Sequence, residues 1–450
     1  GCDPQLFDGL SISKDNGLCK EYMGKFPVVF VSLKDIDASD YKTARGMLIK
    51  VVNQEARRLQ YLLDSEKLSV YDKKIFAALL EQELDDETLY FSLRELTELL
   101  NKHFCRKAIL LIDEYDVPLA KANEQGYYRE MTALIRSLFS AALKTNENLY
   151  FAVLTGCLRV AKESIFTGLN NMNIFSITDG DLDEYFGFTD REVREMLRYY
   201  GLEENYETVK EWYDGYRFGK AEVYCPWDVV CYCSKHRKNK KLPPQNYWIN
   251  TSGNEVLRHF ISGMASQRMV TKAQMERLVE GETVQKEIYQ ELTYPELYAS
   301  SDNLWSTLFM TGYLTQRGEP DGNLFHLAIP NREVRNIFTE QILKMFQEAA
   351  GRDGEALGAF CNALEYGRAG EVERRLTGYL EKTISIRDIF ARKLSKENFY
   401  HGILLGILGF KDGWTVSSKR EAGDGFSDIM IQTENMERAI LIEVKYAEDN

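Results

Sequence analysis

The chain has 450 residues, about three times the roughly 150 residues of a typical domain, so we expect two to four domains. Apolar residues make up 44% and charged residues 28%, a balance that excludes a disordered chain, a collagen and a coiled-coil rod. The 56 Lys and Arg residues are outnumbered by 69 Asp and Glu residues, and the net charge of −13 argues against a protein that coats nucleic acid through bulk charge, so any contact with nucleic acid must be local.

The sequence contains neither a charge-free run of about 18 apolar residues nor the basic and apolar stretches of an export signal at its start. Eight cysteines are too sparse for a disulfide scaffold, so we expect reduced thiols and a cytoplasmic protein. The chain begins with Gly1 and stops just after a strand-like run, EVKY. We therefore expect an internal fragment of a longer protein.

Four apolar runs lie between residues 26 and 178, namely FPVVFVSL, RKAILLIDEYD, LYFAVLTG and NIFSIT. They predict strands over residues 28–33, 108–112, 149–154 and 174–177. Residues 41–62 and 89–104 carry apolar side chains at three- and four-residue spacing, which predicts helices. Continuous apolar strands separated by helices indicate a parallel sheet covered on both faces, so the first domain is expected to be α/β.

Polar residues follow two of these strands at the edge where parallel sheets bind ligands. Asp113 and Glu114 come directly after residues 108–112, as in the Walker B arrangement, in which the first acid holds magnesium through water and the second polarises the attacking water. Thr155 follows the next strand, where ATPases keep a sensor of the γ-phosphate, and Arg159 could meet the same phosphate. The alternatives are a chance pair of acids at a strand end and, for Arg159, a charged helix face.

The sequence has no phosphate-binding G-x-x-x-x-G-K-[ST] loop. The only imitation is GYRFGKA at residues 215–221, which is one residue too short, ends in Ala and follows a helical segment instead of a strand. We reject it as a phosphate cradle.

The middle of the chain is expected to be mainly helical. The segments FTDREVREMLRYY and ETVKEWYDGYRF predict helices, and a β-hairpin is expected within TGYLTQRGEPDGNLFHLAIP. Three cysteines and a histidine between residues 225 and 236 have the types of metal ligands, but their spacing fits no paired C-x-x-C motif, so half-buried thiols are favoured over zinc. The basic run KHRKNKK at residues 235–241 could contact nucleic acid, although a solvated loop is the favoured interpretation.

The last segment is expected to pass from a helix to at least three short strands. A two-residue period places Glu443 and Lys445 on one strand face, and Asp428 lies fifteen positions before Glu443, enough for a strand and a turn. Two carboxylates could bind magnesium while the lysine orients or deprotonates a water at a scissile phosphate. The structural alternative is an ordinary E-x-K string on an exposed strand.

Several strings together resemble the predicted AAA-ATPase-like family that is usually joined to a C-terminal PD-(D/E)XK nuclease module. Among them are LLIDEYDVPL, TGCLRVAKESIFTGLNN, WYDGYRFG, VYCPWDV, NYWINTSGN and IPNREV. The resemblance implies that the P-loop strand and its lysine lie upstream of QLFDGLSI. It also matches Asp113 and Glu114 to the family's acids, and Glu397 to a helix acid that often adds a metal contact.

We therefore expect four parts: an AAA-ATPase-like domain with an incomplete P-loop-NTPase-like parallel sheet (1–180), a helical lid-like domain (181–246), a helical domain with a hairpin (247–385) and an incomplete PD-(D/E)XK nuclease-like domain (386–450). The expected function is an ATPase coupled to a magnesium-dependent nuclease that acts on nucleic acid. The alternative is a nucleotide-responsive switch or scaffold whose nuclease-like domain binds a partner without cleavage. A protein partner or homo-oligomer stays open, and this chain by itself is not expected to bind or hydrolyse ATP.

Overall fold

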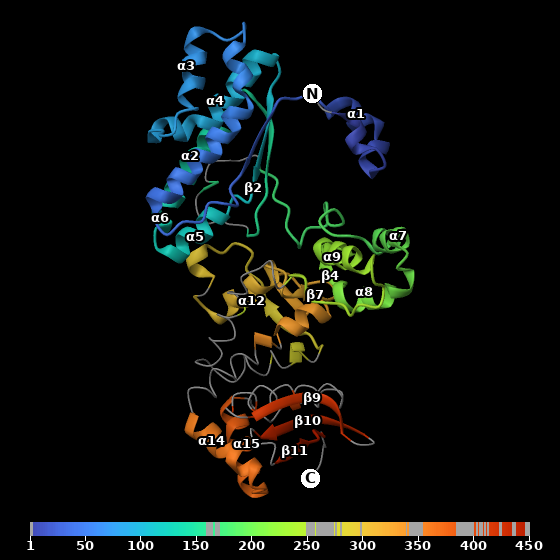
Figure 1. Ribbon diagram of the computed structural model, residues 1–450. Helices are drawn as coiled ribbons and strands as arrows, with labels where there is room; N and C mark the ends of the chain where they lie inside the picture. The colour runs from blue at the N-terminus through green and yellow to red at the C-terminus, as the bar shows by residue number, and fades with distance from the viewer. Residues whose placement is uncertain are drawn as a thin grey trace. The chain divides into compact units, whose positions relative to one another are not determined.

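The computed structural model describes residues 3–158, 165–166, 172–248, 257, 274, 277–279, 281–297, 299–338, 340–341, 354–383, 400–401, 404, 408, 411, 414–422, 425–433 and 438–445. It forms two compact units (Figure 1). Unit 1 comprises Gly1–Ile174 and Gln290–Leu297, and unit 2 comprises Phe175–Tyr289 and Tyr298–Asn450.

Unit 1 is an α/β fold around a parallel sheet with the order β1-β2-β3, formed by β1 (Val28–Ser32), β2 (Ala108–Asp113) and β3 (Leu149–Leu154). The three predicted strands of this sheet are confirmed to within one residue. The helices are α1 (Asn16–Tyr22), α2 (Tyr41–Arg58), α3 (Val70–Ala78), α4 (Asp86–Phe104), α5 (Val117–Gln125) and α6 (Tyr128–Leu143), with 3-10 turns η1 (Pro4–Phe7), η2 (Ser11–Lys14), η3 (Gln60–Asp64) and η7 (Tyr294–Glu296).

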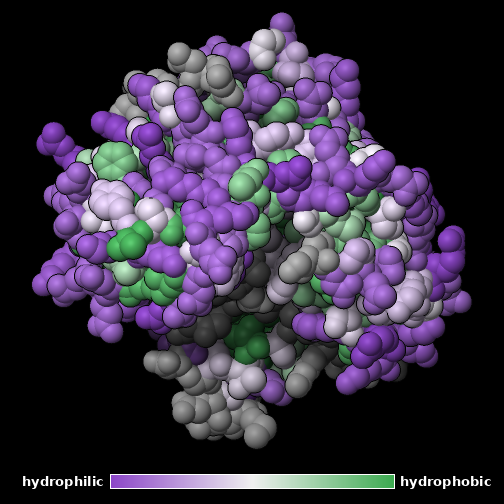
Figure 2. Space-filling view, turned by 90° about the horizontal axis from the view of Figure 1, so that it is seen from above, coloured by the Kyte–Doolittle hydropathy of each residue, from purple (hydrophilic) through white to green (hydrophobic). Residues whose placement is uncertain are grey.

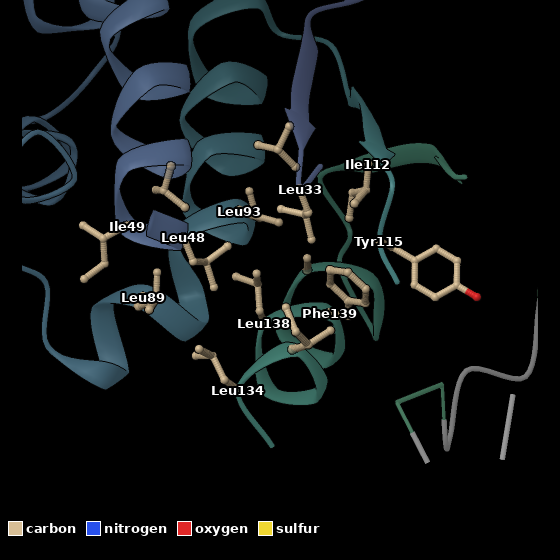
Figure 3. Packing of buried hydrophobic residues seen from close by; sticks show 14 of the residues in the cluster. Leu33, Leu48, Ile49, Leu89, Leu93, Ile112, Tyr115, Leu134, Leu138 and Phe139 are labelled. Atoms are coloured by element: carbon tan, nitrogen blue, oxygen red, sulfur yellow. The ribbon is translucent and has the colours of Figure 1, made fainter. Parts of the chain in front are cut away.

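The core of unit 1 lies between the sheet and its helices. Helix α4 begins where the Asp85 carboxylate accepts a hydrogen bond from the Thr88 amide, and its leucines at three- and four-residue spacing are buried. Leu93 of α4 and Phe139 of α6 point toward Leu33 and Ile112 at the ends of two strands (Figure 3). Burial of this apolar face is the main stabilising contribution to unit 1.

The two faces of the sheet differ among the described residues. Val29 and Val31 of β1 are buried on the side of α2 and α4, whereas Phe30 of β1 and Val153 of β3 point to the other side and are exposed. Leu111 of β2 lies between them in register, so these side chains share one open face. The prediction of two covered faces is therefore not met in the part of the chain that the structure describes, where helices pack on the face that carries Val29 and Val31.

The prediction of a fourth strand over residues 174–177 is wrong. The backbone there is irregular, because the Asp179 carboxylate accepts hydrogen bonds from the Ser176 amide at 2.7 Å and from the Ser176 hydroxyl at 2.8 Å. These bonds close a turn in which the apolar residues do not alternate along a strand.

Unit 2 begins with helices and a small hairpin: α7 (Asp190–Tyr200), η5 (Glu203–Asn205), α8 (Tyr206–Tyr213), β4 (Tyr216–Phe218), β5 (Ala221–Val223) and α9 (Pro226–His236). A three-stranded antiparallel sheet follows, with the order β6-β8-β7, formed by β6 (Val284–Glu287), β7 (Thr315–Gln316) and β8 (Leu324–Ala328), with α12 (Ser301–Met310) inserted in the chain between β6 and β7. The predicted hairpin over residues 311–330 is confirmed as β7 and β8, whereas β6 was not predicted.

The C-terminal part of unit 2 contains α14 (Gly354–Glu365), α15 (Ala369–Thr383) and a second antiparallel sheet. Its strands β9 (Trp414–Ala422), β10 (Gly425–Thr433) and β11 (Ala439–Ile442) have the order β11-β10-β9. Ile429 and Ile431 of β10 are buried, which fixes the face of this sheet that packs into the core of unit 2.

The GYRFGKA segment forms the β4–β5 hairpin, which supports its rejection as a phosphate loop. Gly215 has a φ of +100°, and a Cβ built there would lie 2.1 Å from the Pro330 carbonyl oxygen. The close approach of two backbone segments therefore explains why residue 215 is a glycine.

In the ranges that the structure describes, no helix is long and apolar enough to cross a membrane. Hydrophilic residues cover most of the face seen in Figure 2, and hydrophobic residues gather on it in small groups.

Candidate functional sites

The first candidate site lies at the carboxyl edge of the parallel sheet in unit 1. The Thr155 hydroxyl donates a 2.5 Å hydrogen bond to one oxygen of Asp113, and the Ser32 hydroxyl lies 3.2 Å from the other. The three residues come from the ends of β3, β2 and β1. The parallel register therefore assembles a half-buried carboxylate and two hydroxyls at one place, as the sequence predicted for Asp113 and Thr155.

Glu114 follows Asp113 in a left-handed backbone conformation, with a φ of +55°. Its amide donates a 3.4 Å hydrogen bond to the Thr155 hydroxyl. Partial burial, together with the negative charges of Asp116 and Asp113, raises the pKa of Glu114, and Lys34 opposes the shift. A carboxylate with a raised pKa at a ligand-binding edge is suited to accepting a proton.

A third acid, Asp116, anchors this edge and was not singled out from the sequence. Its buried carboxylate accepts hydrogen bonds from the amides of Cys157 at 3.1 Å and Leu158 at 2.9 Å. It also accepts a 2.9 Å hydrogen bond from the Tyr294 hydroxyl, 178 positions away in the chain. Asp116 therefore ties the turn after β2 to the turn after β3 and to η7.

Gly156 sits inside this connection. A Cβ at this position would lie 2.6 Å from an Asp116 carboxylate oxygen and 2.6 Å from a ring carbon of Tyr115. The Tyr115 hydroxyl in turn donates to the Leu158 carbonyl at 2.7 Å. The two residues after β3 thus have different roles. The threonine hydrogen-bonds to Asp113, and the glycine leaves space for the Tyr115 ring and the Asp116 carboxylate.

The second candidate site lies at one end of the β10–β11 pair in unit 2. Ile429 pairs with Ile442, so Asp428 and Glu443 stand opposite each other just beyond that pair. The Lys445 ammonium lies 3.0 Å from a Glu443 oxygen, and the two side chains are 74% and 66% exposed. The three polar residues singled out from the sequence therefore meet at the same end of the hairpin.

The Asp428 carboxylate is held more firmly than the side chains of Glu443 and Lys445. It accepts a 2.9 Å hydrogen bond from the Val444 amide, which fixes one of its oxygens. A ring nitrogen of His401 lies 2.8 Å from the Asp428 carbonyl oxygen and ties this strand end to the preceding helical turn. The half-buried acid is thus oriented by backbone contacts, while Glu443 and Lys445 remain accessible.

Comparison with protein-family models identifies both ends of the chain. Residues 3–166 match the model described as a predicted AAA-ATPase, and residues 395–450 match the PD-(D/E)XK nuclease superfamily. The chain is therefore similar to AAA-ATPase-like domains over residues 3–166 and to PD-(D/E)XK nucleases over residues 395–450.

One curated relative is a protein of Azotobacter chroococcum mcd 1 described as an uncharacterized protein in the vnfD 5′ region. It is 26% identical over 246 residues, which cover 53% of this chain and 43% of the relative. The chain thus matches less than half of that relative's length. No solved structure matches the chain.

In the AAA-ATPase-like domain, Asp113, Ser32 and Thr155 offer the oxygen atoms that a hydrated magnesium ion prefers, so the residues at this edge fit the metal. Arg159 lies outside the described residues. The sequence has no G-x-x-x-x-G-K-[ST] loop, so no such loop provides backbone amides to bind the phosphates.

In the nuclease-like domain, Asp428 and Glu443 offer two carboxylates, and Glu397, the expected third acid, lies outside the described residues. Within the described ranges, no three His, Cys, Asp or Glu side chains come together as a metal site. This includes the cysteines near His236, whose two ring nitrogens already face the carbonyl oxygens of Tyr232 at 2.8 Å and Leu242 at 2.9 Å.

Of the residues that sequence reasoning missed, Asp116 had a signal, since it is the third acid of the DEYD string. Tyr294 had none, because nothing in its surroundings indicates a partner so distant in the chain.

Proposed function

We propose that the protein is a metal-dependent nuclease acting on nucleic acid, in which the AAA-ATPase-like domain controls the nuclease-like domain. The observation that carries the proposal is the meeting of Asp428 and Glu443 across the β10–β11 pair, with the Lys445 ammonium 3.0 Å from Glu443. The match of residues 395–450 to the PD-(D/E)XK superfamily supports it.

Each residue has a distinct role in this proposal. Asp428 and Glu443 would hold a magnesium ion through hard carboxylate oxygens, with Glu397 as a further ligand. When bound, the ion supplies an activated water and offsets charge at the scissile phosphate. Lys445 orients or deprotonates that water, and its exposure leaves it within reach of a polymeric substrate. The Val444 amide keeps Asp428 aimed at the site.

In a longer protein that also supplies a phosphate-binding loop, Asp113 would hold the magnesium ion of ATP through water, with Thr155 reading the γ-phosphate and Arg159 contacting it. Glu114 would act as the base that polarises the attacking water, a role that the raised pKa of its carboxyl supports. Because Asp116 and Tyr294 brace this edge, they are positioning residues in the proposal.

A cleavage assay with plasmid and single-stranded DNA or RNA, in Mg²⁺ or Mn²⁺, tests the nuclease. We expect cleavage by the wild-type chain and its loss in Asp428→Asn and in Lys445→Ala. The asparagine retains an acceptor for the Val444 amide, so this variant separates chemistry from folding. Glu373→Gln, an exposed carboxylate on α15 of the same unit, is the matched control and should cut normally.

The second candidate function, a nucleotide-responsive switch or scaffold, is favoured by the net charge of −13. In that case neither the wild-type chain nor the two variants would cut any substrate. The nuclease-like domain would still bind its partner. Cleavage that persists in Asp428→Asn would instead show that the active site lies elsewhere.

A further inference from the structure

A compact group of basic residues in unit 2 stands out against the acidic chain. Six exposed cations gather where α7 and α9 end, and we call them the basic surface: Arg198, Lys235, Arg237, Lys238, Lys240 and Lys241. Residues far apart in the chain meet there, since the Lys240 ammonium donates to the Gly201 carbonyl just after α7 and the side-chain amide of Asn205 donates to the Lys240 carbonyl at 3.3 Å.

The loop that carries most of these cations is held in place by a buried histidine. His236, which is fully buried, faces the Tyr232 carbonyl at 2.8 Å with one ring nitrogen and the Leu242 carbonyl at 2.9 Å with the other. The Asn239 side chain also accepts a 3.1 Å hydrogen bond from the Lys241 amide. Residues 237–241 are thus folded back against α9, so the cations are presented in a preorganised loop.

The charges of these cations are not neutralised by neighbouring carboxylates. Across the described ranges, no carboxylate forms an ion pair with any residue of the basic surface. Cations at helix C-termini also stabilise the helix dipole, which is the structural alternative. It applies to Arg198 and Lys235 in the last turns of α7 and α9, to Arg237 at the C-cap of α9 and to Lys240, which bonds to the end of α7, whereas Lys238 and Lys241 lie beyond both helices.

An exposed aromatic ring completes the arrangement. Tyr199 is 83% exposed and follows Arg198 directly at the end of α7. Cations that reach phosphates beside an aromatic ring that can stack on a base are the usual combination in surfaces that track a nucleic-acid strand.

We propose that the basic surface binds the phosphate backbone of nucleic acid. This inference rests on the proposed action on nucleic acid, for which it supplies a contact away from Asp428, Glu443 and Lys445 in the sequence. The basic surface is also a local contact, which is the only kind that a chain with a net negative charge is expected to make with nucleic acid.

The test is fluorescence anisotropy with a labelled DNA duplex of about 20 base pairs and with its single strand, in EDTA so that no cleavage occurs. The test variant combines Arg237→Gln, Lys238→Gln and Lys241→Gln. The control combines Lys42→Gln, Lys50→Gln and Arg57→Gln, three exposed cations of α2, so both variants have the same net charge.

We expect the wild type and the control to bind alike. In the test variant, affinity at low salt should fall by at least about tenfold, and the slope of log K against log salt should flatten by roughly 2 to 3 for the duplex. Circular dichroism should be unchanged, since all six substituted side chains are exposed.

Equal binding by the test variant and the wild type would overturn the inference, as would a wild type that binds anionic lipid vesicles but no DNA. The binding assay also separates this inference from the proposed nuclease. DNA that is bound through the basic surface but never cut would refute only the nuclease. DNA that is cut with no effect of the test variant on binding would refute only the basic surface.

Discussion

At the scale of single residues, the most unusual pair is Asp228 of α9 and Glu333, which are 2% and 0% exposed. Burial and the negative charge of Asp228 raise the pKa of Glu333, so the two carboxyls lie close together, and Asp228 Oδ1 and Glu333 Oε2 have no hydrogen-bond donor among the described residues. The titratable groups that face them are neutral, namely Cys225, Cys231, Tyr213, Tyr216 and Tyr247. A shared proton satisfies both oxygens, so we interpret the pair as an acid and its conjugate base.

This pair predicts that unit 2 loses stability as the pH rises. Burial raises the pKa of Asp228 to about 6 and that of Glu333 to about 8, both above the values of about 4 in an unfolded chain. The folded state therefore binds more protons, and its stability, complete below about pH 4, falls as the pH passes through about 8, by an amount on the order of a few kcal/mol. Thermal unfolding at several pH values measures it.

Glu333→Gln should flatten that dependence, because the amide can donate to Asp228 and still accept from the Trp248 amide, which lies 2.6 Å from Glu333 Oε1. Glu207→Gln, an exposed control on α8, should leave the pH dependence as it is. A wild-type chain that gains stability between about pH 5 and pH 8 would contradict the shared proton.

At the scale of elements, the glycine that begins the β4–β5 hairpin is required by the backbone that lies against it. Gly215→Ala should destabilise unit 2 by about 2 to 4 kcal/mol, because it adds strain at a positive φ to a clash with the Pro330 carbonyl. In contrast, Gly358→Ala in α14 has open space around the added methyl group and should leave stability unchanged or raise it by about 0.5 to 1 kcal/mol. Chemical denaturation compares the two. Equal effects would mean that the Gly215 backbone is not held against Pro330.

The same scale shows which elements can be read from sequence. Strands β1, β2 and β3 were predictable because their apolar runs are continuous and end in polar residues, and α4 because its leucines recur at helical spacing. Residues 174–177 have a comparable apolar content, but the carboxylate of Asp179 closes a turn over them. Asp113 and Thr155 could be paired in advance from the rule that parallel strands end at one edge, whereas Tyr294 could not, since its partner Asp116 is 178 positions away.

At the scale of the whole molecule, the two acids that we propose for an ATPase, Asp113 and Glu114, stand in a sequence that has no G-x-x-x-x-G-K-[ST] loop. We expect titration calorimetry of the 450-residue chain with ATP and Mg²⁺ to show no micromolar binding, because backbone amides and a lysine contribute most nucleotide affinity. Asp113→Ala is the control, since it should leave this result unchanged. Micromolar binding that disappears in Asp113→Ala would place a phosphate site at the carboxyl edge of the parallel sheet after all.

The segment Gln290–Leu297 belongs to unit 1, although both its neighbours in the chain belong to unit 2. The polypeptide therefore passes between the units three times, after Ile174, after Tyr289 and after Leu297. A protease that cut only after Ile174 would release residues 1–174 covalently, and only noncovalent contacts would then hold them to Gln290–Leu297, which stays joined to unit 2. Within unit 1, the hydrogen bond from the Tyr294 hydroxyl to Asp116 is therefore a contact between two pieces of chain that unit 2 separates in the sequence.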